Sequence, residues 1–443
     1  MVVIGIWKDR PGWSDTGHVP TLTASGGNMV LCNAAFIVAS QHLDAHIEGD
    51  HPNRPRKAKM LPILLTILAN WLRDRTSPAS AGVTLALPAP APRPTRRRDR
   101  RTRKRINLAL QGGGAHGAFT WGVLDQLLAD RRLEIDGISG SSAGAINAVL
   151  LADGLNRGGP EEARARMAAF WRAVSVDGQL SDVQRAVAER LFPFVPRDGL
   201  WFGTLSRFFS PYDLNPLNIN PLKELMERFV DFEALRKNSD RDLFLSATNV
   251  HTGEVRIFTR KEISADVVSA SACLPLLFRA VEIDGVPYWD GGYTANPPLV
   301  PFLAATGTED LLIVQINPRE RRKLPTSSRD ILKCVNEINF NAPLLSELRG
   351  VNFCNRLLDG GRLPRGTHAG QFRRLRLHRI GMDDLADNAP APSTLTRDYQ
   401  AFEMLHKRGQ RAARRFLDAH FNDIGRRSSM HDELAIPELD VAV

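Results

Sequence analysis

Between about residues 106 and 320, the order of hydrophobic and polar positions in this 443-residue chain alternates between two periods. Short continuous apolar runs are typical of strands buried on both faces, and apolar residues at every third or fourth position are typical of helices. The runs lie at 106–111, 135–139, 242–250 and 310–317, the last of them the expected final strand of a sheet. The helical patterns lie at 117–130, 143–153, 160–175, 180–191 and 263–274. This alternation predicts an α/β fold in three layers, with a mainly parallel sheet between helices.

One pair of strands is expected to form a hairpin. The apolar runs 281–283 and 286–289 flank Asp284-Gly285, a dipeptide that is a strong turn signal. The second strand delivers Asp290 at its end. Gly291 and Gly292 then let the chain turn without a side chain in the way.

The chain divides into four predicted segments. Residues 1–75 are an N-terminal extension of unclear structure, and 76–105 are a proline-rich and basic linker. Residues 106–320 are the main α/β domain. Residues 321–443 are a mostly helical C-terminal extension that packs on this domain, and they include an amphipathic helix at about 395–418.

Two further segments carry many apolar side chains without a clear period. Residues 60–72 form a run of 13 residues, shorter than the ~20 that a membrane-spanning helix needs. This run fits a helix in a membrane interface or a helix packed on the main domain. Residues 192–212 hold seven aromatic side chains, interrupted by prolines. They fit the wall or lid of an apolar pocket, or an ordinary insertion packed on the sheet.

Positive charge is concentrated in one tract. The formal net charge is +9, and residues 93–105 carry nine arginines and lysines against the single Asp99. By charge alone the tract is suited to anionic lipid headgroups or nucleic acid, but a solvated basic linker is the favoured explanation. The rest of the chain is nearly neutral. We expect no nucleic-acid partner, and the sequence leaves the oligomeric state open.

The four cysteines are far apart and form no C-x-x-C pair; they are Cys32, Cys273, Cys334 and Cys354. This spacing argues against a disulfide framework and against a thiolate zinc site, and it fits a reducing compartment. We therefore expect a cytoplasmic protein, with peripheral membrane contact as a further option. No cluster of metal ligands occurs, so we expect neither a metal nor an organic cofactor.

The segment Gly140-Ser141-Ser142-Ala143-Gly144 follows a predicted strand and opens a predicted helix. It has the G-x-S-x-G pattern of a nucleophile elbow, in which a sharp turn projects the serine hydroxyl away from the sheet. Ser139 and Ser141 are neighbouring serines, but only Ser142 has glycines two residues away on both sides. Ser142 is therefore the predicted nucleophile.

Upstream lies a second glycine-rich loop, Gln111-Gly112-Gly113-Gly114-Ala115-His116-Gly117. Three consecutive glycines expose bare backbone amides that can point to a common anion. The N–H groups of Gly113 and Gly114 are expected to be the main donors. Taken together, this loop, the GSSAG elbow and Trp289-Asp290-Gly291-Gly292 resemble, in that order, the patatin-like phospholipase family over about residues 106–303.

The resemblance implies a patatin-like three-layer fold and a serine-dependent lipid acyl hydrolase with a Ser–Asp dyad. It assigns Ser142 as nucleophile and Asp290 as its base. It also implies a lipid substrate at a membrane or lipid-particle surface, with phospholipid first, neutral lipid or lysophospholipid second, and a storage polyester as a further option. The oxyanion-hole amides are assigned to Gly112, Gly113 and Gly114. The remaining motif glycines are Gly117, Gly140, Gly144, Gly291 and Gly292.

Other interpretations remain open. The loop 112–117 also satisfies the dinucleotide-binding pattern G-x-G-x-x-G, and Asp136 follows it at the spacing of a ribose-binding acid. A catalytically silent lipid-binding protein is a third class. His116 occupies a place where the family commonly has arginine or lysine, and it could shape the loop, assist the oxyanion or serve as the base of a Ser–His variant.

Overall fold

A computed structural model describes residues 103–175, 210–214, 218, 220–238, 241–304, 307–319, 324–366, 371–382, 396 and 398–430. The predicted segment 1–75, most of the basic linker, the predicted helix 180–191 and nearly all of the aromatic segment 192–212 lie outside these residues.

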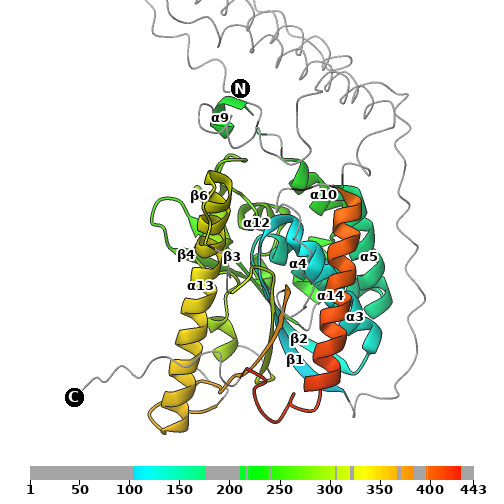
Figure 1. Cartoon of the computed structure of the whole chain (residues 1–443), viewed down its shortest axis with the longest axis vertical. Helices are drawn as coiled ribbons and strands as arrows, with labels where there is room; N and C mark the ends of the chain where they lie inside the picture. The colour runs from blue at the N-terminus through cyan, green and yellow to red at the C-terminus, as the bar shows by residue number, and fades with distance from the viewer. Residues whose placement is uncertain are drawn as a thin grey trace, which may run out of the picture. The chain divides into compact units, whose positions relative to one another are not determined.

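An eight-stranded sheet forms the centre of the described part of the chain (Figure 1). The strands are β1 (Lys104–Leu110), β2 (Leu133–Gly140), β3 (Asp242–Asn249), β4 (Val255–Thr259), β5 (Val281–Ile283), β6 (Val286–Asp290), β7 (Asp310–Gln315) and β8 (Arg376–Gly381). Their order is β5-β6-β3-β2-β1-β7-β8, with β4 paired to β3. Strands β3, β2, β1, β7 and β8 run parallel, whereas β4, β5 and β6 join by antiparallel pairing.

The helices of the described residues connect these strands. They are α3 (Gly117–Asp130), α4 (Ala143–Arg157), α5 (Pro160–Val174), α9 (Pro211–Leu214), α10 (Pro221–Phe229), α11 (Phe232–Asn238), α12 (Ala265–Ser271), α13 (Ser328–Asp359) and α14 (Tyr399–His420). Short 3₁₀ turns are η1 (Gly114–His116), η2 (Arg260–Glu262), η3 (Gly291–Tyr293) and η4 (Val300–Leu303). None of these helices is both long and apolar enough to span a membrane.

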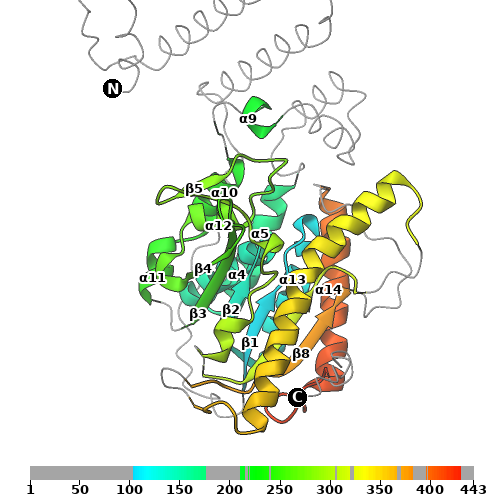
Figure 2. The same ribbon diagram turned by 90° about the vertical axis from the view of Figure 1, so that its left-hand side faces the viewer.

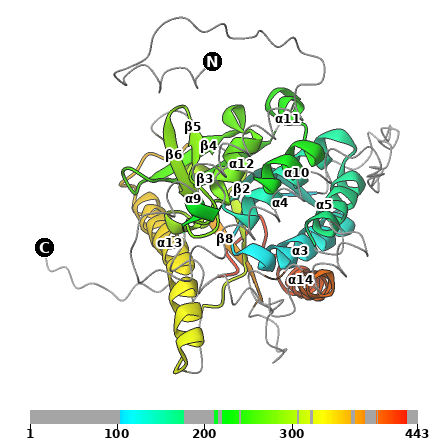
Figure 3. The same ribbon diagram turned by 90° about the horizontal axis from the view of Figure 1, so that it is seen from above.

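Alternating side chains of the strands build two hydrophobic cores. Leu108 and Leu312 point to the face that carries α3, α4, α5 and α14. Ala109 and Leu311 point to the opposite face, where Leu348 of α13 packs. Seen from above, α13 lies on one side of the sheet and the group of α3, α5 and α14 on the other (Figure 3). Both faces are therefore covered, which confirms the predicted three-layer α/β fold.

Helix α14, from the segment predicted at about 395–418, packs along α3. The two backbones approach closely because glycines face the contact from both helices. A side chain at Gly122 would collide with the carbonyl of His406, and one at Gly409 would collide with that of Phe119. This amphipathic helix thus contributes its apolar face, including Phe402, to the main core.

The structure corrects three details of the predicted strands and helices. The strand at 310–317 is not the last, because β8 pairs with β7 in parallel register beyond it. Figure 2 shows β8 beside α13 and α14. Helix α13, a 32-residue element, lies in the extension predicted to be mostly helical, but its bounds were not predicted. Strand β1 begins inside the basic tract: Lys104 donates to the carbonyls of Phe421 and Ile424, so it belongs to the fold and not to a linker.

Candidate active site

Ser142 lies at the sharp turn between β2 and α4. Its backbone has φ 54° and ψ −125°, a conformation that side-chain-bearing residues rarely adopt. The turn is held by Ser271 at the end of α12, whose carbonyl and hydroxyl accept from the Ser142 N–H at 3.1 and 3.0 Å. This geometry is that of a nucleophile elbow, in which fold contacts maintain a strained serine.

The other serines of the elbow have different surroundings. The Ser141 hydroxyl points into the structure, 2.5 Å from the Ser246 hydroxyl and 2.5 Å from the Ala295 carbonyl oxygen. Ser139 is fully buried within β2, and its hydroxyl has no hydrogen-bond partner among the described residues. Ser141 therefore anchors the turn, and Ser142 alone interacts with Asp290.

Asp290 ends β6 and is completely buried. Its backbone N–H donates to the Cys273 carbonyl at 2.8 Å, and its carbonyl accepts from the Thr248 hydroxyl at 2.8 Å. The carboxylate Oδ1 accepts from the Gly292 N–H at 2.7 Å. The Ser142 hydroxyl also interacts with the carboxyl, but with looser geometry, and Oδ2 has no well-formed hydrogen bond among the described residues.

Burial raises the pKa of Asp290 to about 7, although the Ser142 hydroxyl and the Gly292 amide favour the charged form. Two neighbouring groups also have raised pKa values. Burial, reinforced by the negative charge of Asp290, raises the pKa of Cys273 and of Tyr293 to about 12. A carboxyl with a pKa near 7 can take up and release a proton at neutral pH.

The glycine loop after β1 touches the elbow directly. A Cβ at Gly112 would lie 2.5 Å from the Ser141 carbonyl oxygen and 2.6 Å from the Ser142 Cβ, so only glycine fits there. The Gly112 N–H is already bonded to Asn296 Oδ1 at 2.6 Å. Among the described residues, the N–H groups of Gly113 and Gly114 make no hydrogen bond. The loop therefore offers two amides without a hydrogen-bond partner among the described residues, and Gly112 is not one of them.

Buried amide side chains that the sequence did not single out support this loop. Asn296 donates to the Phe340 carbonyl at 2.9 Å, in addition to accepting from Gly112. Gln111 accepts from the N–H groups of Ile316 and Asn317 at 2.9 Å each. The sequence signal that could have indicated Asn296 is its position, four residues after the Asp290-Gly-Gly turn and directly before a proline.

The remaining motif glycines also stand at close approaches, where a Cβ would meet a neighbouring segment. The contacts are with Ala143 for Gly117, with the Gly144 backbone for Gly140, with the Leu110 carbonyl for Gly144, with Ser246 for Gly291 and with the Phe340 ring for Gly292. The last contact brings α13 against the turn that carries Asp290. His116 is buried at the end of η1, in the same loop.

The geometry does not fit a dinucleotide site. The glycine loop follows the C-terminal end of β1, but Asp136 lies next to the start of that strand. Its carboxylate pairs with Arg105 at 2.8 Å, so it does not approach the loop. Within the described residues, no group of His, Cys, Asp or Glu side chains has the arrangement of a metal site.

Comparisons with known proteins give the following matches. Residues 108–303 match the family model of the patatin-like phospholipases. An uncharacterized protein, R571, of Acanthamoeba polyphaga mimivirus is 26% identical over 209 residues, which are 44% of this chain and 61% of that protein. This chain thus spans less than two thirds of that relative.

Two solved structures align with 15% sequence identity. VipD of Legionella pneumophila gives a TM-score of 0.34, covering 71% of this chain and 67% of VipD. ExoU, in its complex with SpcU from Pseudomonas aeruginosa, gives a TM-score of 0.32, covering 72% of this chain and 51% of the matched chain.

Proposed function

Residues 108–303 make up a patatin-like phospholipase domain, and on that premise we propose that this chain hydrolyses acyl esters of lipids. In this proposal Ser142 is the nucleophile, Asp290 is its base, and the amides of Gly113 and Gly114 bind the oxyanion. Phospholipid is the first proposed substrate, with lysophospholipid or neutral lipid as the second. The substrate is reached at a membrane or lipid-particle surface.

The observation that carries the proposal is the raised pKa of Asp290, whose carboxyl interacts with the Ser142 hydroxyl. A serine hydroxyl is a weak nucleophile until a base accepts its proton. An ordinary aspartate, with a pKa of ~3.9, is a poor base for this purpose. Burial raises the pKa of Asp290 to about 7, and the same carboxyl interacts with the Ser142 hydroxyl. Burial thus makes the carboxylate a stronger base without any histidine.

The reaction follows from these positions. Ser142 Oγ attacks the ester carbonyl carbon and its proton passes to Asp290, while the carbonyl oxygen gains negative charge. The free amides of Gly113 and Gly114 donate to that oxygen. The leaving alcohol takes the proton from Asp290, and acyl-Ser142 remains. Water then attacks the acyl group, giving its proton to Asp290, and the fatty acid leaves as the proton returns to Ser142.

The test is ester hydrolysis by purified wild type, Ser142→Ala and Asp290→Asn, with p-nitrophenyl esters and with phospholipid vesicles. Both variants should fold, as judged by circular dichroism, and should lose nearly all turnover. Ser139→Ala is the matched control, since Ser139 is a buried serine three residues away and its hydroxyl is unpartnered among the described residues. This control should retain wild-type rates.

Two results would redirect the proposal. If folded Asp290→Asn keeps most of the wild-type rate, the base is another group and His116→Ala is the next variant. If folded wild type binds lipid vesicles but hydrolyses none of the esters, the silent lipid-binding alternative is correct.

A further inference from the structure

A cavity that the proposed reaction does not use opens beside the first residues of β7 and β8. Its volume is about 320 Å³, and its charged lining consists of Arg365, Arg373, Arg376 and Glu309. This volume is at the lower end of the range of small-ligand pockets. Strands β7 and β8 run parallel to β1, and the glycine loop follows the opposite, C-terminal end of β1. The cavity is therefore at the other end of the sheet from Ser142.

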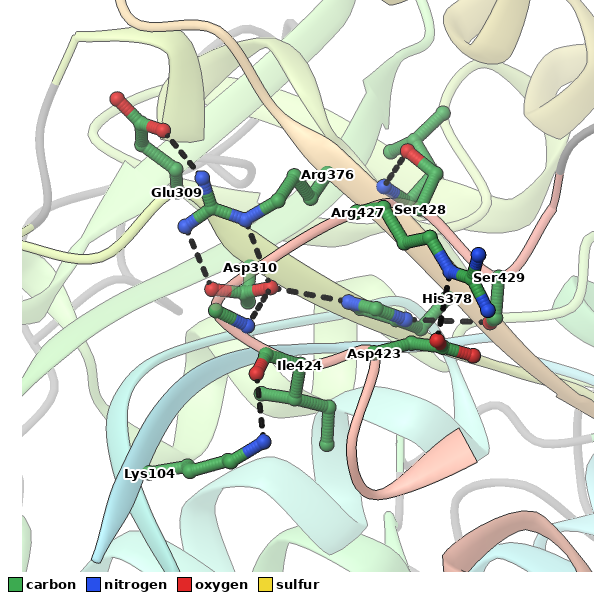
Figure 4. Close-up of polar contacts among 12 residues, drawn as sticks. Lys104, Glu309, Asp310, Arg376, His378, Asp423, Ile424, Arg427, Ser428 and Ser429 are labelled. Carbon is green, nitrogen blue, oxygen red and sulfur yellow. Dashed lines mark hydrogen bonds and ion pairs between the residues drawn. The ribbon is translucent and has the colours of Figure 1, made fainter. Parts of the chain in front are cut away.

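Two of the three arginines have carboxylate partners. Arg376 bonds to Glu309 at 2.7 Å and to Asp310 at 2.8 Å, as Figure 4 shows. Arg365 pairs with Asp359 at 3.2 Å. Glu309 is thus already compensated by Arg376, so the one acidic group of the lining does not neutralise the other two arginines.

Arg373 differs from both of these arginines. Among the described residues it has no carboxylate partner, and its Nε is buried without a hydrogen bond. Its backbone N–H is fixed by the Leu303 carbonyl at 2.9 Å, which holds the residue at the cavity. Arg373 as a whole is partly exposed in the cavity lining, and no carboxylate of the described residues balances its charge, so a bound anion would compensate it.

The wall next to Arg373 is held together by hydrogen bonds to Asp310. Asp310 accepts from His378 Nε2 at 3.0 Å, in addition to its bond with Arg376 (Figure 4). It also accepts from the Gly425 N–H at 2.8 Å. Although burial raises the pKa of Asp310, the hydrogen bonds from His378 and Arg376 hold it well below its usual range. Arg376 is therefore held in place by two carboxylates, to which all three of its guanidinium nitrogens donate.

We propose that this cavity binds a phosphate monoester, with Arg373 as its principal contact and Arg365 as the second. A guanidinium presents parallel N–H donors that match two phosphate oxygens, and a phosphate has enough oxygens for donors from more than one arginine. The cavity is larger than a phosphate alone, so it has room for a glycerol-sized group. That chemistry is shared by free glycerol 3-phosphate and by the headgroup of phosphatidic acid.

Binding is tested on the full chain carrying Ser142→Ala, so that no lipid is consumed whether or not the proposed hydrolysis is correct. Glycerol 3-phosphate is titrated by calorimetry at constant ionic strength, in a buffer free of phosphate and sulfate. We expect saturable binding that Arg373→Gln weakens by about tenfold or more. Arg374→Gln is the matched control, because Arg374 is adjacent in sequence but is not part of the cavity lining. It should change the affinity by less than about twofold.

A second measurement identifies the source of the phosphate. Phosphatidylcholine vesicles with and without phosphatidic acid are sedimented with the same variants. Binding of glycerol 3-phosphate alone supports a free ester, and an increase with phosphatidic acid that Arg373→Gln removes supports a lipid headgroup. Absence of saturable binding in both measurements overturns the proposal, as do equal losses in Arg373→Gln and Arg374→Gln.

Arg365→Gln keeps the test decisive if Arg373→Gln fails to fold. The Arg365 side chain is 56% exposed, so its replacement should leave the fold intact. We expect it to weaken binding by about threefold or more, since one charged donor is lost. Unchanged affinity in Arg365→Gln, together with an unfolded Arg373→Gln, would overturn the proposal.

Discussion

Replacing Asp290 with asparagine should make the protein more resistant to unfolding as the pH rises, even though it removes the proposed base. The carboxyl of Asp290 is completely buried, and its charged form is poorly solvated there. Asparagine has nearly the same shape and carries no charge. The substitution therefore isolates the free-energy cost of holding a negative charge at this position.

The magnitude follows from the pKa. Asp290 has a pKa of about 7 in the folded protein, against an ordinary value of 3.8. A difference of roughly three units corresponds to about 4 kcal/mol. Between pH 4 and pH 7 the folded state keeps a proton on Asp290 that the unfolded state has lost. The contribution of Asp290 to the free energy of unfolding is therefore highest below pH 4 and falls as the pH rises towards 7. Above about pH 8 both states are ionised, and the difference becomes constant.

The assay is urea unfolding of wild type and Asp290→Asn between pH 5 and 8, followed by circular dichroism. Over this range the free energy of unfolding of wild type should fall by roughly 2.5 kcal/mol relative to the variant. Asp284→Asn, at the exposed tip of the same hairpin, is the control and should show no such trend. An equal difference between wild type and Asp290→Asn at pH 5 and pH 8 would refute the reasoning.

Three further outcomes are expected. Ester hydrolysis by wild type should fall as the pH drops below about 7, because protonated Asp290 cannot accept the Ser142 proton; a rate that is flat to pH 5 contradicts this role. Gly112→Ala should lower kcat by about 100-fold or more with an unchanged circular dichroism spectrum, since its Cβ would press on Ser142; activity within a few-fold of wild type would contradict the packing. Asp310→Ala should cost about 3–5 kcal/mol in urea unfolding, because it leaves His378 and Arg376 without their buried partner; a loss below 1 kcal/mol would show that the cluster is solvated.

The sequence predicted those parts of the molecule whose signals are local. The G-x-S-x-G pattern lies within five residues, and the turn at Asp284-Gly285 is specified by two. Both occur where the pattern indicated. The α/β class followed in the same way, from apolar runs that each form one buried strand.

The bounds of other elements could not be predicted from the sequence, because their buried positions are not periodic along the chain. Helix α13 leaves Ile331, Leu332 and Ile338 exposed and buries Leu344 and Leu348 only later, so no single apolar stripe runs along it. Strand β8 contains Arg376 and His378, whose polar groups are matched by Asp310 of β7. Charged residues in a strand obscure its pattern until the partner is known.

The supporting residues of the candidate site were hidden for a related reason. Asn296 bonds to Gly112, from which it is separated by 184 positions. Gln111 reaches Asn317 across 206 positions. An amide side chain has no spacing rule of its own, so its role becomes visible only when the fold brings its partner next to it.

The matched family segment, residues 108–303, ends before β7, which lies between β1 and β8 in the sheet. A fragment cut at those limits would leave one edge of β1 unpaired and would remove α13 and α14 from the two faces of the sheet. The unit that carries the family's sequence signature is thus smaller than the unit that folds. A C-terminal truncation that loses activity would do so because the sheet and its covering helices no longer fold. Such a loss would not show whether the deleted residues take part in the chemistry.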